Sequence, residues 1–508
     1  MESLLNSSLL IGSILLLLSV FLSKSSSKFG LPILILFMFV GIVAGNEGLG
    51  GIQYENYELT HSLSLVAICV IIFSGGLGTK MQDVKPVLKS GVVLSSFGVI
   101  LTTAIVAAFS HLLFEIPVIE SLLLGAILSA TDAAAVFSIF RDKNAQVSKR
   151  LRSVIEFESG SNDPMAYLLV TVFLGYYQNP EVHLQSFGLQ MIINPLVGFL
   201  GGYLLFKAFK FINDRLELDF QGLYPALTIG FLFFVYSSVT HMNGNGFLAV
   251  YVFGILLGNY KIAHKSALVT FFDGTSWLFQ IGLFVLLGLL VFPSRLVQVA
   301  PEAVLVALFI LFVARPAAVY ACLLFSKFSG KEKFFISWAG LKGATPIVFA
   351  SLVATKMGSA SFFIFDVVFF TVLISALFQG SSIKFLAKKM GLLFEAVYDP
   401  EFPIDLEVME KTRNGIKQYT VQDKDFAVGK RLVDLELPTG ARVLFIKRAG
   451  QFIIPDGTTV FEKKDKALLV TREKSEVEEC ILGFQNAGAF EEESDVAAEV
   501  LAKFEGAA

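Results

Sequence analysis

Long apolar stretches, separated by short polar connections, fill most of the chain up to about residue 390. We mark about thirteen windows between Leu4 and Phe385, each with about 20 predominantly apolar residues. A helix of that length crosses a hydrocarbon core about 30 Å thick. The pattern therefore predicts an all-α polytopic membrane protein with about 13 transmembrane helices.

The first apolar window, from Leu9 to Leu22, begins without a basic segment and is not followed by a small-residue cleavage site. A secretory signal peptide would have both features. We therefore interpret this window as the first span and expect the mature chain to begin at Met1.

Lys and Arg concentrate in alternate connections between the windows, whereas the other connections are mostly acidic or neutral. The basic connections hold Lys24, Lys28, Lys80, Lys85, Lys89, Arg141, Lys143, Lys149, Arg150, Arg152, Lys207, Lys210, Arg215, Lys261, Lys265, Lys327, Lys331, Lys333, Lys384, Lys388 and Lys389, and the exceptions are Arg295 and Lys356. Short basic loops stay in the cytoplasm. This distribution predicts an outside N-terminus, a cytoplasmic C-terminus and an odd number of spans in a plasma (inner) membrane.

After Met390 the chain becomes much richer in charge, and short apolar runs such as "RVLFIKR", "QFIIP" and "KALLVT" alternate with turn-forming segments. This pattern predicts a small cytoplasmic α/β or mostly β domain. We divide the chain into a transmembrane domain (1–390), a linker (391–413), a regulatory domain (414–476) and a C-terminal tail (477–508).

The composition supports this organisation and excludes several classes of protein. Hydrophobic residues make up 55% of the 508 positions, which is more than a soluble domain needs. The net charge of -3 comes without a long basic block, so we expect no nucleic-acid partner. The three cysteines form no CxxC pair, so they indicate neither a disulfide framework nor zinc. HExxH and GxSxG motifs are absent, and we do not expect an enzyme.

A few ionisable residues interrupt the apolar windows. They are Asp132, the group Glu156, Glu158 and Asp163, and the single residues Arg315, Lys342 and Asp366. Each charge at the centre of a bilayer costs at least about 2.5 kcal/mol, so such a residue is paired, hydrated or functional. For Asp366 the sequence leaves open whether it faces Lys342 or another helix, and Arg315 is expected to cap carbonyls or to pair internally.

The segment "ESGSNDP" concentrates polar groups on one helical turn. At 100° per residue, Glu158 and Asn162 share one face, and Ser159 and Asp163 share the adjacent face. We interpret this patch, and Asp163 in particular, as functional, whereas an interfacial position is the other interpretation for Glu156. The alternative is an ordinary helix start, with Ser161 or Asn162 as the N-cap.

Asp132 follows Ser129 and Thr131 near the middle of a span. Hydroxyl and carboxylate oxygens are suitable ligands for a monovalent cation. The alternative is that Ser129 and Thr131 bond back to helix carbonyls while Asp132 pairs with a basic residue on a neighbouring helix.

Three segments, "ATDAAAV", "FESGSNDPMAY" and "WAGLKGATPIVFAS", in the fifth, sixth and twelfth windows, resemble the signature segments of the NhaP-type branch of monovalent cation:proton antiporters. "IIFSGGLGT" in the third window is similar to a further segment of that family. The stretch from "GKRLVDLELPTG" to "KALLV" resembles the TrkA-C domain, which is the C-terminal lobe of regulators of potassium conductance (RCK). The combination resembles potassium/proton antiporters more than sodium-selective ones.

The resemblance implies a fold with inverted repeats and crossed, unwound helices, and a homodimer with a static interface domain and a mobile ion-binding domain. It implies that Asp163 holds the proton or the cation, with Asn162 beside it, and that Ser159, Thr131 and Asp132 contribute to the site. The cation ligands would be Asp163, Ser159 and Thr131. It also implies a structural ion pair between Glu158 and Lys342.

Two positions depart from the family pattern. Lys342 stands where relatives usually have Arg, and Ser74 stands near a position where many relatives have an acidic residue, so Ser74 is a possible additional site.

Together, these expectations describe an electroneutral exchange of one K⁺, or also Na⁺, for one proton by alternating access. The cytoplasmic domain regulates this exchange, and no cofactor takes part. The ligand of that domain is left open, and a nucleotide is one option. A Na⁺-selective antiporter and a cation channel remain the alternatives, although the sequence lacks a filter-like "TVGYG" segment. A potassium sensor without transport would leave Asp132 and Asp163 without a role.

Overall fold

The computed structural model describes residues 2–29, 33–132, 136, 146–179, 181, 184–216, 220–260, 262, 265–394, 415–435, 437–438, 440–448, 451–471 and 476–485. They fall into two compact units, residues 1–396 and 397–508. Most of the predicted linker and most of the predicted tail lie outside the described residues.

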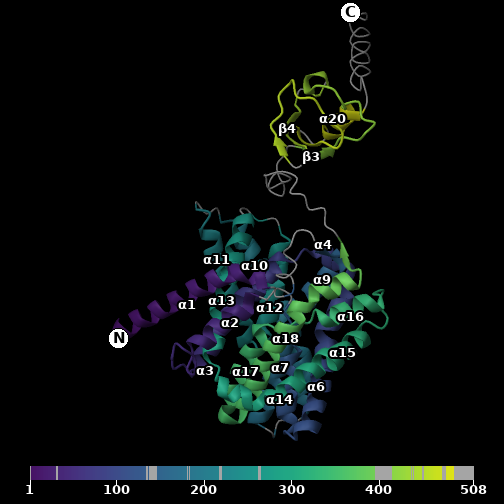
Figure 1. The fold of residues 1–508 in the computed structure, drawn as a ribbon. Helices are drawn as coiled ribbons and strands as arrows, with labels where there is room; N and C mark the ends of the chain where they lie inside the picture. Colours follow the sequence, from purple (N-terminus) through teal and green to yellow (C-terminus); the bar gives the residue numbers. More distant parts are fainter. Residues whose placement is uncertain are drawn as a thin grey trace, which may run out of the picture. The chain divides into compact units, whose positions relative to one another are not determined.

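The first unit is built from helices (Figure 1). The first half of its chain forms α1 (Glu2–Phe29), α2 (Ile33–Ala44), α3 (Tyr57–Gly78), α4 (Met81–Val84), α5 (Leu88–Val93), α6 (Val99–Phe114), α7 (Val118–Ser129) and α9 (Lys149–Gln178). The second half forms α10 (Leu184–Asn213), α11 (Leu223–His241), α12 (Gly246–Gly258), α13 (Lys265–Leu289), α14 (Pro293–Phe309), α15 (Arg315–Cys322), α16 (Gly330–Trp338), α17 (Ala344–Met357) and α18 (Phe362–Lys389).

Seven helical stretches in the described part of the chain are long and apolar enough to cross a membrane. Five shorter apolar helices accompany them, at Leu9–Leu22, Ile33–Ala44, Val118–Ser129, Gly246–Gly258 and Ala344–Met357. The structure thus confirms a mostly helical membrane domain followed by a small sheet-containing domain, while the total of 13 spans stays a prediction.

Glycines allow the helices of one group to approach each other closely. A methyl group at Gly41 of α2 would overlap the backbone of α13, and one at Gly288 of α13 would overlap the backbone of α2. Gly254 and Gly258 of α12 meet the backbone of α3 in the same way. Small residues at such crossings permit tight packing between helices in a membrane, where hydrophobic burial adds little. The helices α2, α3, α12 and α13 therefore form one closely packed group.

A second group contains two helices, α7 and α16, that end in buried non-helical segments. α7 ends at Ser129, and Ala130 is extended, with φ -62° and ψ 145°. In the same way α16 ends at Trp338, and α17 begins only at Ala344. The two non-helical segments meet where the backbone N–H of Asp132 donates to the carbonyl of Leu341 at 2.8 Å. α17 also packs against α7, α9 and α18 (Figure 1).

A short two-stranded sheet joins two distant parts of the first unit. β1 (Gln146–Val147) immediately precedes α9, and β2 (Leu393–Phe394) follows α18. The strands are antiparallel, with Gln146 opposite Phe394 and Val147 opposite Leu393. The chain that leaves α18 is thereby attached to the start of α9.

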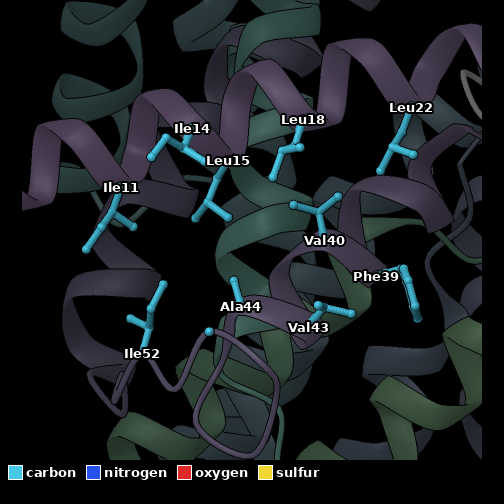
Figure 2. A pocket seen from close by; sticks show the side chains of 11 residues that line it. Ile11, Ile14, Leu15, Leu18, Leu22, Phe39, Val40, Val43, Ala44 and Ile52 are labelled. Atoms are coloured by element: carbon cyan, nitrogen blue, oxygen red, sulfur yellow. The ribbon is translucent and has the colours of Figure 1, made fainter.

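An apolar cavity of about 370 Å³ lies between α1 and α2. Figure 2 shows aliphatic side chains of both helices turned toward it, among them Leu15, Leu18, Val40 and Val43. Its lining offers no ligand for an ion, so this cavity is not the candidate functional site.

The second unit contains a four-stranded antiparallel sheet in the order β3 (Gly415–Thr420), β6 (Lys466–Thr471), β4 (Arg442–Arg448) and β5 (Gln451–Ile453). The sheet packs with α20 (Glu476–Gln485), and Ile446, Phe461 and Phe484 are fully buried in the core. Arg448 binds the carboxylate of Asp465 at 2.7 Å and that of Glu462 at 2.6 Å. The predicted strands "RVLFIKR", "QFIIP" and "KALLVT" contain β4, β5 and β6 in that order.

Candidate functional site

The predicted polar patch lies inside a long helix. α9 begins at Lys149, and its N-cap is Ser148, whose side chain accepts a hydrogen bond from the backbone N–H of Leu151 at 3.3 Å. The alternative of a helix start at Ser161 or Asn162 is therefore wrong. Glu156 lies one turn after Arg152, at 3.8 Å from it, and is partly exposed.

Asn162 and Ser159 bind the break after α7. The Asn162 amide donates to the Thr131 hydroxyl at 2.5 Å and to Oε1 of Glu158 at 3.1 Å. The Ser159 hydroxyl donates to the Thr131 carbonyl at 2.5 Å. The break and the patch, which are 28 residues apart or more in sequence, thus meet in one buried site. Ser129 instead donates back to the carbonyl of Ala126 at 2.6 Å, as the structural alternative for that residue predicted.

Asp163 lies beside the start of α17. Its Oδ2 accepts a hydrogen bond from the hydroxyl of Thr345 at 2.9 Å. Its Oδ1 is buried without a hydrogen-bond partner among the described residues, and so is Oδ1 of Asn162. Buried polar atoms are normally hydrogen-bonded, and exceptions call for a specific explanation such as a bound ion. Two neighbouring residues therefore each offer an unused oxygen.

The ion pair of Glu158 differs from the one that the family resemblance implied. Oε1 of Glu158 binds Nη2 of Arg315 at 2.9 Å, and both side chains are 2% exposed, so the expected pairing of Glu158 with Lys342 is wrong. Gly340 makes room for this arrangement, since a methyl group there would overlap the guanidinium of Arg315. Arg315 is long enough to reach Glu158 from α15, and its planar donors suit a carboxylate.

Lys342 instead lies at the end of α7. Its ammonium donates to the carbonyl of Ala130 at 3.1 Å, and its backbone N–H donates to the hydroxyl of Ser375 at 3.0 Å. The carboxylate of Asp132 lies against Gly343, the N-cap residue of α17, so closely that a methyl group at Gly343 would overlap it. A cation at a helix C-terminus and an anion at a helix N-terminus are both stabilised by the helix dipole. The C-terminus of α7 and the N-terminus of α17 therefore supply partial charges for Lys342 and Asp132, respectively.

The remaining ionisable residues lie apart from this site. Asp366 binds Arg295 of α14 at 2.8 Å, so its partner lies on another helix and is not Lys342. Ser74 is half-buried on α3, and no hydrogen bond connects it with the site residues that the structure describes. In the described part of the chain, no three His, Cys, Asp or Glu side chains form a cluster that could hold a metal ion.

The contact of Thr345 with Asp163 and the pairing of Arg315 with Glu158 were not predicted from the sequence. Thr345 stands in the segment "WAGLKGATPIVFAS", and Arg315 is one of the ionisable residues of the apolar windows. A hydroxyl two positions after Gly343, the N-cap residue of α17, was the available signal for Thr345. For Arg315 the signal was its position in an apolar window, which requires a partner.

The family model "Sodium/hydrogen exchanger, transmembrane" matches residues 14–389, and the model "TrkA-C domain" matches residues 416–478. A K⁺/H⁺ antiporter NhaP2 of Shewanella oneidensis is 34% identical over 92% of this chain and 82% of its own length. A K⁺/H⁺ antiporter NhaP of Alkalimonas amylolytica is 33% identical over 92% of this chain and 81% of its own length.

Among solved structures, the sodium/proton antiporter MjNhaP1 of Methanocaldococcus jannaschii has a similar fold. The TM-score is 0.66 at 23% sequence identity, and the match covers 76% of this chain and 99% of the other. At this identity the likeness shows the fold alone.

We predict that Arg315→Ala lowers the free energy of unfolding by about 3–5 kcal/mol, because it leaves the Glu158 carboxylate buried and unpaired. Adding Glu158→Ala should restore much of that loss, whereas adding Lys342→Ala should not. Thermal unfolding of the purified variants in detergent measures the difference. Restoration by Lys342→Ala rather than by Glu158→Ala would contradict the pairing.

Proposed function

The chain belongs to the sodium/hydrogen exchanger family, and we propose that it exchanges a monovalent cation, K⁺ in preference to Na⁺, for a proton across the membrane. The observation that carries this proposal is a pair of buried oxygens, Oδ1 of Asp163 and Oδ1 of Asn162, that have no hydrogen-bond partner among the described residues. A carboxylate in that position holds either a proton or a cation, but not both.

The preference for K⁺ has two supports. The two curated relatives compared above are named for K⁺/H⁺ exchange. The chain also carries a TrkA-C domain in addition to its exchanger domain. A Na⁺-selective antiporter is the alternative within the same family.

In the proposed cycle, the site consists of Asp163, Asn162, Ser159, Thr131 and Asp132. Asp163 binds the cation in its charged form, and Ser159 and Thr131 are the further oxygen ligands. Asn162 holds the break after α7 against α9 through its bond to Thr131. Binding of a proton to Asp163 expels the cation, and alternating access delivers each ligand to the other side of the membrane.

The opposite charges of Glu158 and Arg315 cancel in their ion pair, so the pair adds no net charge to the site that binds the cation. Lys342, whose ammonium donates to the carbonyl of Ala130, is assigned no proton exchange in this cycle. Asp163 then binds either one cation or one proton at a time, which makes the exchange electroneutral at one cation per proton.

We further propose that the chain lies in the plasma (inner) membrane as a homodimer, with the N-terminus outside and the sheet domain in the cytoplasm. The alternating distribution of Lys and Arg supports this orientation. The domain assignment is residues 1–390 for exchange, 391–413 for the linker and 414–476 for regulation, followed by the tail. No cofactor is required.

The sheet of β1 and β2 supports regulation by the cytoplasmic domain. β2 lies at the beginning of the linker to that domain, and β1 directly precedes the N-cap of α9, the helix that carries Asp163. A force on the linker therefore reaches α9 through the pairing of Val147 with Leu393 and of Gln146 with Phe394.

Asp163→Asn should abolish cation/proton exchange and leave the protein folded, because the amide cannot alternate between a proton and a cation. Uptake of K⁺ and Na⁺ into everted vesicles, measured across a series of pH values, tests this. The matched control is Asp273→Asn, which changes an exposed carboxylate on α13 and should leave exchange normal. Near-normal exchange by Asp163→Asn would refute the site assignment.

Lys342→Arg should retain electroneutral exchange, because an Arg also stays charged at the end of α7. Currents on a solid-supported membrane measure the net charge moved. A sustained transport current driven by a cation gradient in the parent protein, lost in Lys342→Arg, would mean that Lys342 carries a proton and that the stoichiometry is different.

Deletion of the chain beyond Glu401 should preserve exchange but change its dependence on pH or on a regulatory ligand. Deletion of residues 486–508 alone is the control, since it spares every described element of the sheet domain. Leu393→Pro combined with Phe394→Pro should reproduce the larger deletion, because proline cannot donate to the pairing with β1. Complete loss of transport with normal membrane insertion would show instead that the domain is part of the transport machinery.

A further inference from the structure

We propose that Asn245, a residue outside the ion site, positions the turn of α9 that carries Asp163. The predicted effect on transport rests on the proposed function. Asn245 is 5% exposed and is the N-cap residue of α12, a helix that packs against α9 and α10.

Pro164 weakens α9 directly after Asp163. Proline has no backbone N–H, so the carbonyl of Gly160 lacks its usual partner within the helix. A helix interrupted in this way adjusts more easily at that turn. The position of Asp163 therefore depends on contacts from outside α9 as well as on the helix itself.

Asn245 supplies such a contact. Its side-chain amide donates to the carbonyl of Pro164 at 2.7 Å. Its Oδ1 accepts from the backbone N–H of Leu248 at 3.0 Å and thereby caps α12. Because a cap needs an acceptor, this second bond fixes which side-chain atom is oxygen and leaves the amide nitrogen for Pro164.

The backbone of Asn245 is held as well. Its N–H donates to the carbonyl of Asn194 in α10 at 2.9 Å, and its carbonyl accepts from Ala249 at 3.1 Å. Gly198 of α10 permits this approach, since a methyl group there would overlap the carbonyl of Asn245. The donor that reaches Pro164 is therefore fixed to two further helices.

α12 also contacts α9 on the other side of Asp163. A methyl group at Gly160 would overlap the ring of Tyr251, a residue of α12 that is 2% exposed. The turn from Gly160 to Pro164 is thus held at both ends by one neighbouring helix. Of these two contacts, only the one from Asn245 is a hydrogen bond, and it reaches the residue next to the exchanging carboxylate.

Two substitutions separate the capping role of Asn245 from its contact with Pro164. Asn245→Asp keeps an acceptor for the cap but replaces the donor with a carboxylate oxygen. Asn245→Gln keeps the amide donor on a longer side chain and is a poor cap. The control is Asn56→Asp, because Asn56 caps α3 in the same manner, with its Oδ1 accepting from Leu59 at 2.8 Å.

If Asn245 is a positioning residue, Asn245→Asp should lower the maximal rate of K⁺/H⁺ exchange at least about five-fold, which corresponds to about 1 kcal/mol for one hydrogen bond. It should also shift the pH profile of exchange. Asn245→Gln should retain more exchange than Asn245→Asp even if it unfolds at a lower temperature. Asn56→Asp should match the parent protein.

Amide hydrogen exchange of the purified variants gives a readout that does not require transport. Peptides covering residues 158–170 should exchange faster in Asn245→Asp than in Asn245→Gln or the parent protein, whereas the start of α12 should be affected mainly by Asn245→Gln. A parent protein without exchange activity would refute the proposed function but leave this comparison intact. Parent-like protection of α9 and a parent-like pH profile in Asn245→Asp would overturn the inference.

Discussion

The cost of leaving an ionisable side chain unpaired inside a membrane governs the arrangement of the transmembrane domain. Glu158 and Arg315 neutralise each other, and Asp366 binds Arg295. Asp163 differs from these residues, because one of its oxygens is bound by Thr345 while the other is buried without a partner among the described residues. Asp163 is thus a buried carboxylate that is only partly satisfied, and a proton or a cation would each satisfy its remaining oxygen.

The end of α7 and the beginning of α17 make this arrangement possible. Where α7 ends and α17 begins, backbone carbonyls and N–H groups become available in the buried centre. Lys342 uses the carbonyl of Ala130, and Asp132 lies at the start of α17. Non-helical backbone at this depth is tolerated only where it is covered by protein or lines a cavity. The breaks therefore need the covering helices α9 and α18, and α9 is the helix that carries Asp163.

Much of this could be predicted from the sequence, because membrane length and the rarity of charges in apolar windows are local properties. The patch from Glu158 to Asp163 was found in that way, and the strands of the small domain were read from short apolar runs. Contacts between side chains far apart in the sequence could not be predicted. Glu158 and Arg315 are 157 positions apart, and a single chain gives no reason to prefer Arg315 over Lys342. The bond from Asn245 to Pro164 was missed for the same reason, since Asn245 looks like an ordinary helix cap.

In the proposed exchange, a proton and a cation compete for Asp163. Proton release on adding K⁺ to the purified, weakly buffered protein, followed with a pH indicator, measures this competition. We expect one proton released for each cation bound, a smaller release at high pH, where Asp163 is already ionised, and no release from Asp163→Asn. Cation binding without proton release, or equal release from Asp163→Asn, would rule out the competition.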